Sequence, residues 1–297
     1  MVDIVLMFHL MQAVPMTAVL ILVGDVFQLP SVGPGNVLAD MIASKRIPVY
    51  YLHKIFRQAH ESPIVVNAHL VRRGEFPALT KLDASQDLSE FYFIQQSDPD
   101  KVAATIVELC SQAIPRRFDF DPVHEVQVLT PMHKGVVGTT NLNQVLQNVL
   151  NPNPVLIKTQ GSVFKSGDKV MHLKNNYQKE VFNGDIGTIS TIDRKNEVLS
   201  VDYYGRTVDY DFSEMDEISL AYAISVHKSQ GSEYPAVIVP IVTQHFVLLQ
   251  RNLLYTAITR ATKLVILIGT QKALAIALKN NKPRKRLSSL AVQLQGN

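Results

Sequence analysis

Two polar loops near the end of the chain hold the residues best suited to bind phosphates. Residues 225–233 combine hydroxyls, a lysine, a glycine and a carboxylate within nine positions. Residues 255–261 follow after an apolar run and carry Arg260. Hydroxyls, backbone amides and a forked guanidinium are groups that hold phosphate oxygens. The sequence therefore predicts one side of a phosphate-binding site.

A third polar loop, residues 24–35, follows an apolar run at residues 17–23. Such a run predicts a strand buried on both faces of a parallel sheet, and ligand loops of these sheets follow the carboxyl ends of strands. The loop begins with Gly24 and Asp25 and can direct the amide of Gln28 at a phosphate or a water. A simple β-turn capped by Asp25 remains an alternative.

The elements that would position these loops alternate between strands and helices, which predicts α/β layers around a mostly parallel sheet. Apolar runs predict strands at residues 49–52, 91–94, 126–130, 236–239 and 264–268. Helical spacing covers residues 2–13, 62–73, 99–114, 138–150 and 248–260.

Residues 155–219 depart from this alternation of strands and helices. They contain no helical pattern, only short alternating runs separated by Gly, Asn and Asp turns. We expect a small all-β barrel inserted into the α/β domain. Its first half is basic, with Lys165, Lys169, Lys174 and Lys179, so it could grip a nucleic-acid strand or serve only as a scaffold.

Composition limits the remaining possibilities. The 297 residues are 46% hydrophobic and 19% charged, as in ordinary globular proteins, and the net charge of +3 permits a polyanionic partner without establishing one. The single cysteine, Cys110, lies in a helical apolar pattern, which predicts a buried thiol and a reducing compartment. The apolar N-terminus carries Asp3 and Pro15 and lacks a basic leader. We therefore expect a cytoplasmic protein without membrane contact.

Five segments, in order, resemble the motifs of superfamily 1 helicases, specifically the RecD-like group that includes the exodeoxyribonuclease V alpha subunit. Residues 24–35 resemble motif III, 52–58 motif IV, 225–233 motif V and 255–261 motif VI. Residues 130–135 are similar to a segment that contacts DNA in this group. The resemblance extends from Met1 to about residue 270. It implies an α/β, RecA-like motor domain of the P-loop NTPase type with an inserted SH3-like β-barrel, plus a remnant of the first motor domain.

The resemblance also implies roles for residues at a nucleotide. Gln28 would sense the γ-phosphate, and Arg57 and Arg260 would reach it from the second motor domain. Gly231 would allow close backbone approach, and Glu233 would accept a hydrogen bond from a ribose hydroxyl. Salt bridges at a sheet edge for the arginines, and an exposed, uninvolved Glu233, remain alternatives.

Contact with the DNA backbone is implied for a second set, in which phosphates set the affinity and base edges are not read. Its two histidines could equally be structural. The set comprises Thr130, His133, Ser225, His227, Lys228 and Ser229.

Two departures from the family pattern matter. Phe27 stands where many relatives carry an acidic residue. No glycine in the chain is followed by lysine, so the phosphate-binding P-loop is missing, as is the acidic pair that holds Mg²⁺. We therefore expect ATP and Mg²⁺ to bind the full-length protein, no metal bound by this chain itself, and no ATP hydrolysis by the chain alone.

These observations predict the C-terminal part of an ATP-dependent 5′–3′ DNA helicase or translocase of DNA repair and recombination, which binds single-stranded DNA. Other exodeoxyribonuclease V subunits remain open as partners. We expect a first-motor-domain remnant at residues 1–46, a second motor domain at 47–154 and 220–297, and the barrel at 155–219. The alternative is a truncated, non-catalytic DNA-binding or assembly subunit.

Overall fold

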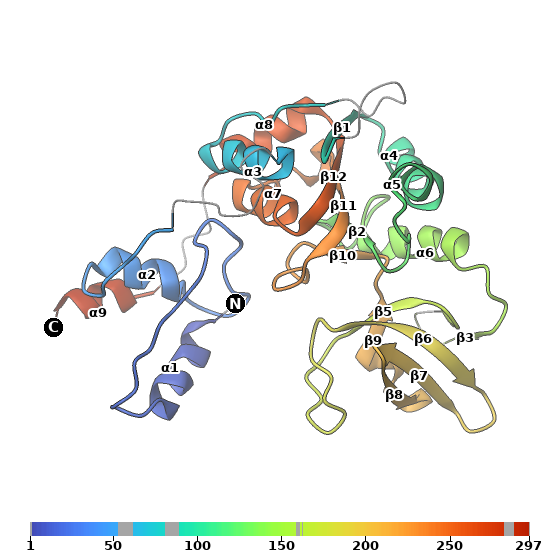
Figure 1. Cartoon of the computed structure of the whole chain (residues 1–297), viewed down its shortest axis with the longest axis horizontal. Helices are drawn as coiled ribbons and strands as arrows, with labels where there is room; N and C mark the ends of the chain where they lie inside the picture. The colour runs from blue at the N-terminus through green and yellow to red at the C-terminus, as the bar shows by residue number, and fades with distance from the viewer. Residues whose placement is uncertain are drawn as a thin grey trace.

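The computed structural model describes residues 2–52, 62–80, 89–158, 161, 163–281 and 288–296. Its largest unit is a five-stranded sheet in which every pairing is parallel. The strand order β1-β12-β11-β2-β10 confirms the predicted α/β class (Figure 1). The strands are β1 (Phe91–Gln95), β2 (Val126–Thr130), β10 (Ala223–Ser225), β11 (Tyr234–Ile241) and β12 (Ala261–Gly269).

Alternate side chains of strand β12 enter two separate cores. Val265 and Leu267 pack on one face, whereas Leu264 and Ile266 pack on the other. Strands buried on both faces need no polar alternation, which is why their sequences are continuous apolar runs. Helices cover each face (Figure 1). On the first face lie α3 (Pro63–Arg73), α7 (Arg251–Ile258) and α8 (Gln271–Lys279).

The second face is covered by a longer helical segment than the sequence predicts. α4 (Pro99–Glu108) continues through a π-helical turn (Leu109–Ala113) into α5 (Ile114–Phe118), and α6 (Thr139–Leu150) lies beside them. Cys110 is buried there as expected, and burial raises the pKa of its thiol to about 12. At neutral pH it is therefore an unreactive thiol.

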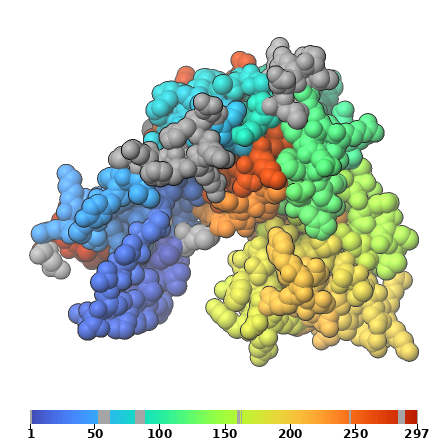
Figure 2. All heavy atoms as spheres, viewed as in Figure 1, coloured from blue at the N-terminus to red at the C-terminus, as the bar shows by residue number. Residues whose placement is uncertain are grey.

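The β-rich insertion forms its own unit. Five antiparallel strands in the order β8-β7-β6-β5-β9 pack with the β3-β4 hairpin around a core that includes Phe164, Leu199 and Tyr210. In Figure 2 this unit, in yellow, lies on the opposite side of the view from the blue N-terminal residues. The strands are β3 (Leu156–Lys158), β4 (Val163–Lys165), β5 (Lys169–His172), β6 (Ile186–Asp193), β7 (Val198–Tyr203), β8 (Arg206–Asp211) and β9 (Ile218–Leu220).

The N-terminal segment carries two helices away from the sheet. α1 (Ile4–Ala13) begins at Asp3, whose carboxylate accepts from the amide of Leu6 at 2.8 Å, a typical N-cap. α2 (Val37–Ser44) lies beside α9 (Leu290–Gly296), and Arg46 donates to the carbonyl of Gln295 at 3.0 Å (Figure 1). The C-terminal helix α9 therefore packs against α2 in the N-terminal segment.

Two of the predicted strands do not form. Residues 17–23 and 49–52 have no strand partner in the described chain, and Val19, Ile21 and Val23 are 87%, 79% and 87% exposed. The apolar pattern is present, but a strand needs a neighbour for its backbone hydrogen bonds, and no described segment pairs with either run in this way. The boundaries proposed near residues 46, 154 and 219 stay predictions.

No described helix has both the length and the apolar character required to cross a membrane. Within the same residues, no group of three or more His, Cys, Asp or Glu side chains could hold a metal ion.

Candidate functional site

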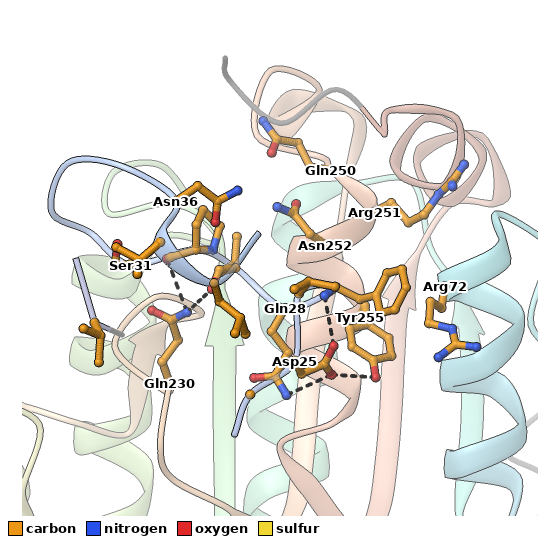
Figure 3. Close-up of a pocket in the computed structure, with 18 of the residues that line it drawn as sticks. Asp25, Gln28, Ser31, Asn36, Arg72, Gln230, Gln250, Arg251, Asn252 and Tyr255 are labelled. Carbon is orange, nitrogen blue, oxygen red and sulfur yellow. Dashed lines mark hydrogen bonds between the residues drawn. The ribbon is translucent and has the colours of Figure 1, made fainter. Parts of the chain in front are cut away.

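A cavity of about 570 Å³ lies between the loop at residues 24–35 and the first helical face of the sheet. Its wall combines this loop with α3, the start of α7 and the loop at residues 225–233 (Figure 3). Its lining includes Gly24, Asp25, Phe27, Gln28, Arg72, Gln230, Gly231, Arg251, Asn252, Tyr255 and Arg260. Residues 225–233 and 255–261 thus reach the same place as the loop that begins at Gly24.

Asp25 organises the loop. Its Oδ1 accepts from the amide of Phe27 at 2.9 Å, and its Oδ2 accepts from Nε2 of Gln28 at 3.3 Å. The phenol of Tyr255, on α7, donates to the same Oδ2 at 2.9 Å (Figure 3). Burial, reinforced by the charge of Asp25, raises the pKa of Tyr255, so its hydroxyl remains a donor. The capped turn considered from the sequence is present, and it also links the loop to α7.

Arg260 is the buried cation of the cavity. The residue is 7% exposed. Its guanidinium donates to Oε1 of Gln28 at 3.3 Å, to the carbonyl of Ser232 at 3.0 Å and to the carbonyl of Thr256 at 3.3 Å. Burial lowers its pKa, while the nearby charge of Glu233 opposes that effect. Arg260 makes no salt bridge to a described carboxylate, so its positive charge is held by neutral oxygens. Such a charge favours an anionic ligand.

Two further hydrogen bonds attach the loop to the sheet domain. The amide of Leu29 donates to Oγ1 of Thr256 at 2.8 Å, and Nε2 of Gln230 donates to the carbonyl of Leu29 at 2.6 Å. Leu29 itself is buried in the core under α3 and α7. These contacts fix the position of Gln28 relative to Arg260.

Phe27, the departure from the family pattern, contacts α3. The guanidinium of Arg72 lies over its ring at 4.8 Å from the centroid, which is the geometry of a cation–π interaction. An aromatic ring at this position therefore still contributes to holding the loop against the sheet domain.

Of the other described residues expected to contact the nucleotide, only Gly231 is found in the cavity lining. Gly231 lines the cavity with a φ of 91°, a conformation that favours glycine. Glu233 is exposed and outside the cavity lining, and acts there only through its charge on Arg260. Arg57 lies outside the described residues.

A second hollow, a groove of about 850 Å³, separates α6 from the β-rich insertion. Three residues expected to contact DNA line it, His133, Ser225 and Lys228, together with Lys158 and Lys165 of the insertion. Partial burial lowers the pKa of Lys228, and no described carboxylate pairs with its amine. The groove therefore presents positive charge that is not neutralised by an ion pair.

The remaining expected DNA contacts lie elsewhere. Thr130 and Ser229 are fully buried, and their hydroxyls donate to the carbonyls of Val137 at 2.7 Å and Val226 at 2.8 Å. They stabilise the loops that carry their neighbours. His227 is exposed but does not line the groove. Any DNA contact by these three residues stays a prediction.

The basic half of the insertion differs from the expected gripping surface. Lys169 is fully buried and donates to the carbonyl of Val126 at 3.1 Å. Lys174 and Lys179 pair with Asp216 at 3.0 Å and Glu214 at 2.5 Å. Of the four lysines named from the sequence, only Lys165 lines the groove. Lys158 was missed because it stands alone in a weakly patterned segment, and only tertiary packing brings it to this surface.

Three family models match successive parts of the chain. The family model of the ATP-dependent RecD-like DNA helicase SH3 domain matches residues 142–203. The model of the UvrD-like helicase C-terminal domain matches residues 220–268, and that of an AAA domain matches residues 1–91.

Two curated relatives align with nearly the whole chain. The ATP-dependent RecD2 DNA helicase of Deinococcus radiodurans is 34% identical over 289 residues, which cover 96% of this chain and 37% of the relative. The RecBCD enzyme subunit RecD of Mycobacterium tuberculosis is 28% identical over 304 residues, which cover 99% of this chain and 52% of the relative. The chain thus spans about a third to a half of the length of these relatives.

Among solved structures, a Pif1 helicase from Bacteroides, in complex with ADP-AlF3 and ssDNA, is similar with a TM-score of 0.50 and 17% identity. The match covers 92% of this chain and 65% of that one. Together with the five-stranded parallel sheet and the SH3 match, it confirms the RecA-like fold with an SH3-like insertion. The chain matches the C-terminal portion of RecD-like superfamily 1 helicases.

Proposed function

We propose that this chain is the C-terminal part of an ATP-dependent 5′–3′ DNA helicase that binds single-stranded DNA and supplies arginines to ATP. Repair and recombination of DNA in the cytoplasm is the setting that the resemblance implies. The names of the RecD relatives suggest assembly with other subunits of an exodeoxyribonuclease V-type enzyme. The observation that carries the proposal is the joining of the loop at residues 24–35 to Arg260 through Gln28.

Binding of single-stranded DNA is supported by the groove between α6 and the insertion. Lys158, Lys165 and Lys228 line it, together with the largely buried Ser225. Cations and hydroxyls of this kind bind phosphates without reading a sequence, which suits an enzyme that moves along DNA. The relative in the Pif1 structure was crystallised with ssDNA, which agrees with this use of the fold.

The cavity near Arg260 fits part of a nucleotide site. A buried, unpaired guanidinium can stabilise the charge that spreads over a transferred phosphoryl group. Gln28, held by Asp25 and Arg260, can report the state of that phosphate to the rest of the loop. Arg57 would be the second arginine, as the resemblance implies.

The same cavity does not fit the metal part of that site. Asp25 is the only acidic residue in its described lining, and both carboxylate oxygens already accept hydrogen bonds. With no glycine followed by lysine in the sequence, the chain also lacks a P-loop. We therefore propose that the chain alone does not hydrolyse ATP, and that ATP and Mg²⁺ need the P-loop and acidic pair of a first motor domain.

Fluorescence anisotropy with a labelled thymidine oligonucleotide tests the DNA part of this proposal. Affinity of the purified chain should fall as salt rises, because bound lysines release counterions from the strand. Lys228→Ala should weaken binding and reduce the slope of log affinity against log salt by roughly 0.7. Lys174→Ala, at a lysine paired with Asp216 outside the groove lining, is the matched control. An affinity independent of salt would refute phosphate binding in the groove.

A further inference from the structure

Helix α6 carries one group of polar side chains that stabilise the fold. Asn141 donates to the carbonyl of Val136 at 2.6 Å, and Asn143 exchanges two hydrogen bonds of 2.8 Å with the backbone of Ala223. Gln147 and the cap residue Asn151 donate to the carboxylate of Asp168 at 2.5 and 2.7 Å. These amides are occupied inside the protein.

A second group on the same helix has no such role. Thr140, Gln144 and Asn148 are exposed, and their side chains make no hydrogen bond to any residue in the described ranges. Residues four apart share one face of a helix and rise about 6 Å from one to the next. Because all three line the groove of about 850 Å³, they form a row along one of its walls.

The rest of the groove differs in chemistry from the uncharged row on α6. Lys158, Lys165 and Lys228 contribute its positive charge, and Leu156 contributes apolar surface. In Figure 1, α6 lies beside the parallel sheet and above the insertion. A single strand in this groove would meet cations along part of its length and uncharged amides on the α6 side.

We propose that Thr140, Gln144 and Asn148 contact the bases of the strand, whose phosphates lie along the lysines. This inference rests on the proposed binding of single-stranded DNA and adds base contacts to it. A carboxamide carries both a donor and an acceptor, so Gln144 and Asn148 can pair with an edge of any base by rotating. The row therefore increases affinity for unpaired bases without selecting a sequence.

A pair of oligonucleotides separates base contacts from phosphate contacts. One is a thymidine oligonucleotide, and the other has the same length and phosphates but abasic sugars. The double variant Gln144→Met, Asn148→Leu keeps the side-chain size and removes the hydrogen-bonding groups. We expect it to bind the thymidine strand about tenfold more weakly than the unmodified chain does, and the abasic strand equally well.

Two controls accompany this measurement. Gln112→Met changes an exposed glutamine on the neighbouring π-helical turn, outside the groove lining, and should bind both strands like the unmodified chain. Lys228→Ala should weaken binding to both strands by the same factor, because both carry phosphates.

The outcomes distinguish the two levels of the proposal. If the double variant loses affinity equally for both strands, or for neither, the base-contacting role of α6 is wrong, while phosphate binding in the groove stands. If the unmodified chain binds neither strand, the proposed DNA-binding function is itself wrong.

Discussion

Oε1 of Gln28 accepts a hydrogen bond from Nη2 of Arg260 at 3.3 Å, although 232 positions separate the two residues. The same guanidinium donates to the backbone of the loop at residues 225–233 through the carbonyl of Ser232. Arg260 thus joins two loops that the sequence suggested separately as phosphate-binding elements. We expect a ligand that replaces the hydrogen bond between Gln28 and Arg260 to change how the loop at residues 24–35 lies against the loop at residues 225–233.

The attachment of the loop at residues 24–35 to the sheet domain can be tested at Thr256. Thr256→Val removes the acceptor of the Leu29 amide, so we expect the loop to detach more often and that amide to exchange faster with solvent. Thr259→Val is the matched control, because its hydroxyl donates only to the carbonyl of Thr256. Amide exchange followed by mass spectrometry checks both. Equal exchange at Leu29 in the two variants would show that the hydrogen bond does not hold the loop.

Asp168 is expected to hold the two walls of the groove together. Its fully buried carboxylate accepts from Gln147 of α6 and the cap residue Asn151, from the amide of Lys165 at 2.6 Å and from the phenol of Tyr222 at 2.9 Å. Asp168→Ala leaves these donors without an acceptor and should lower the free energy of unfolding by about 3 kcal/mol or more.

Chemical denaturation measures the effect of Asp168→Ala. Asp193→Ala also removes a carboxylate that accepts hydrogen bonds, but at an exposed turn of the insertion, so it should lower the denaturation midpoint much less. A loss no larger for Asp168→Ala than for this control would contradict the role of Asp168 as the link between the walls.

Stability at alkaline pH should depend on Lys169. Burial lowers the pKa of its amine from 10.5 to about 8, so the folded state gives up the proton before the unfolded state does. Below pH 8 the folded protein bears the cost of a buried charge, and this cost disappears as pH rises to 10.5. The Lys169 contribution to the free energy of unfolding should therefore rise by about 3 kcal/mol over this interval.

Comparison with Lys169→Met isolates that contribution. Both proteins should carry Cys110→Ala, because the Cys110 thiol interacts electrostatically with Lys169. Several buried tyrosines also titrate at alkaline pH, and to a first approximation their effects cancel in the difference between the two proteins. We expect the stability of the variant relative to the unmodified chain to be greatest near pH 7 and to decline up to pH 10.5. A difference that stays constant with pH would mean that Lys169 titrates normally.

The sequence predicts the central sheet well because its information is local. Strands such as β12 are continuous apolar runs, and α3 and α6 show helical spacing with clear ends. The insertion is also recognisable, since its turns are marked by Gly, Asn and Asp. The runs at residues 17–23 and 49–52 show the limit, because local pattern cannot supply a strand neighbour.

The candidate sites depend more on tertiary contacts. The proximity of Gln28 to Arg260 followed only from the family resemblance, since nothing in either segment specifies the other. Lys169 looked like part of a basic surface, yet it is buried against Val126. The division of the α6 amides into bonded and unbonded groups depends on partners such as Ala223 and Asp168, far from the helix in sequence.

The most direct test of the account is DNA-stimulated ATP turnover in a chimera. In it, this chain replaces the matched residues of the Deinococcus radiodurans relative, so that the remainder of that protein supplies what this sequence lacks. We predict turnover that Arg260→Ala reduces by about 10³-fold or more, with affinity for single-stranded DNA unchanged. The isolated chain should show none. Full turnover by the Arg260→Ala chimera, or turnover by the isolated chain that Arg260→Ala abolishes, would contradict the claim that this chain provides one side of a nucleotide site.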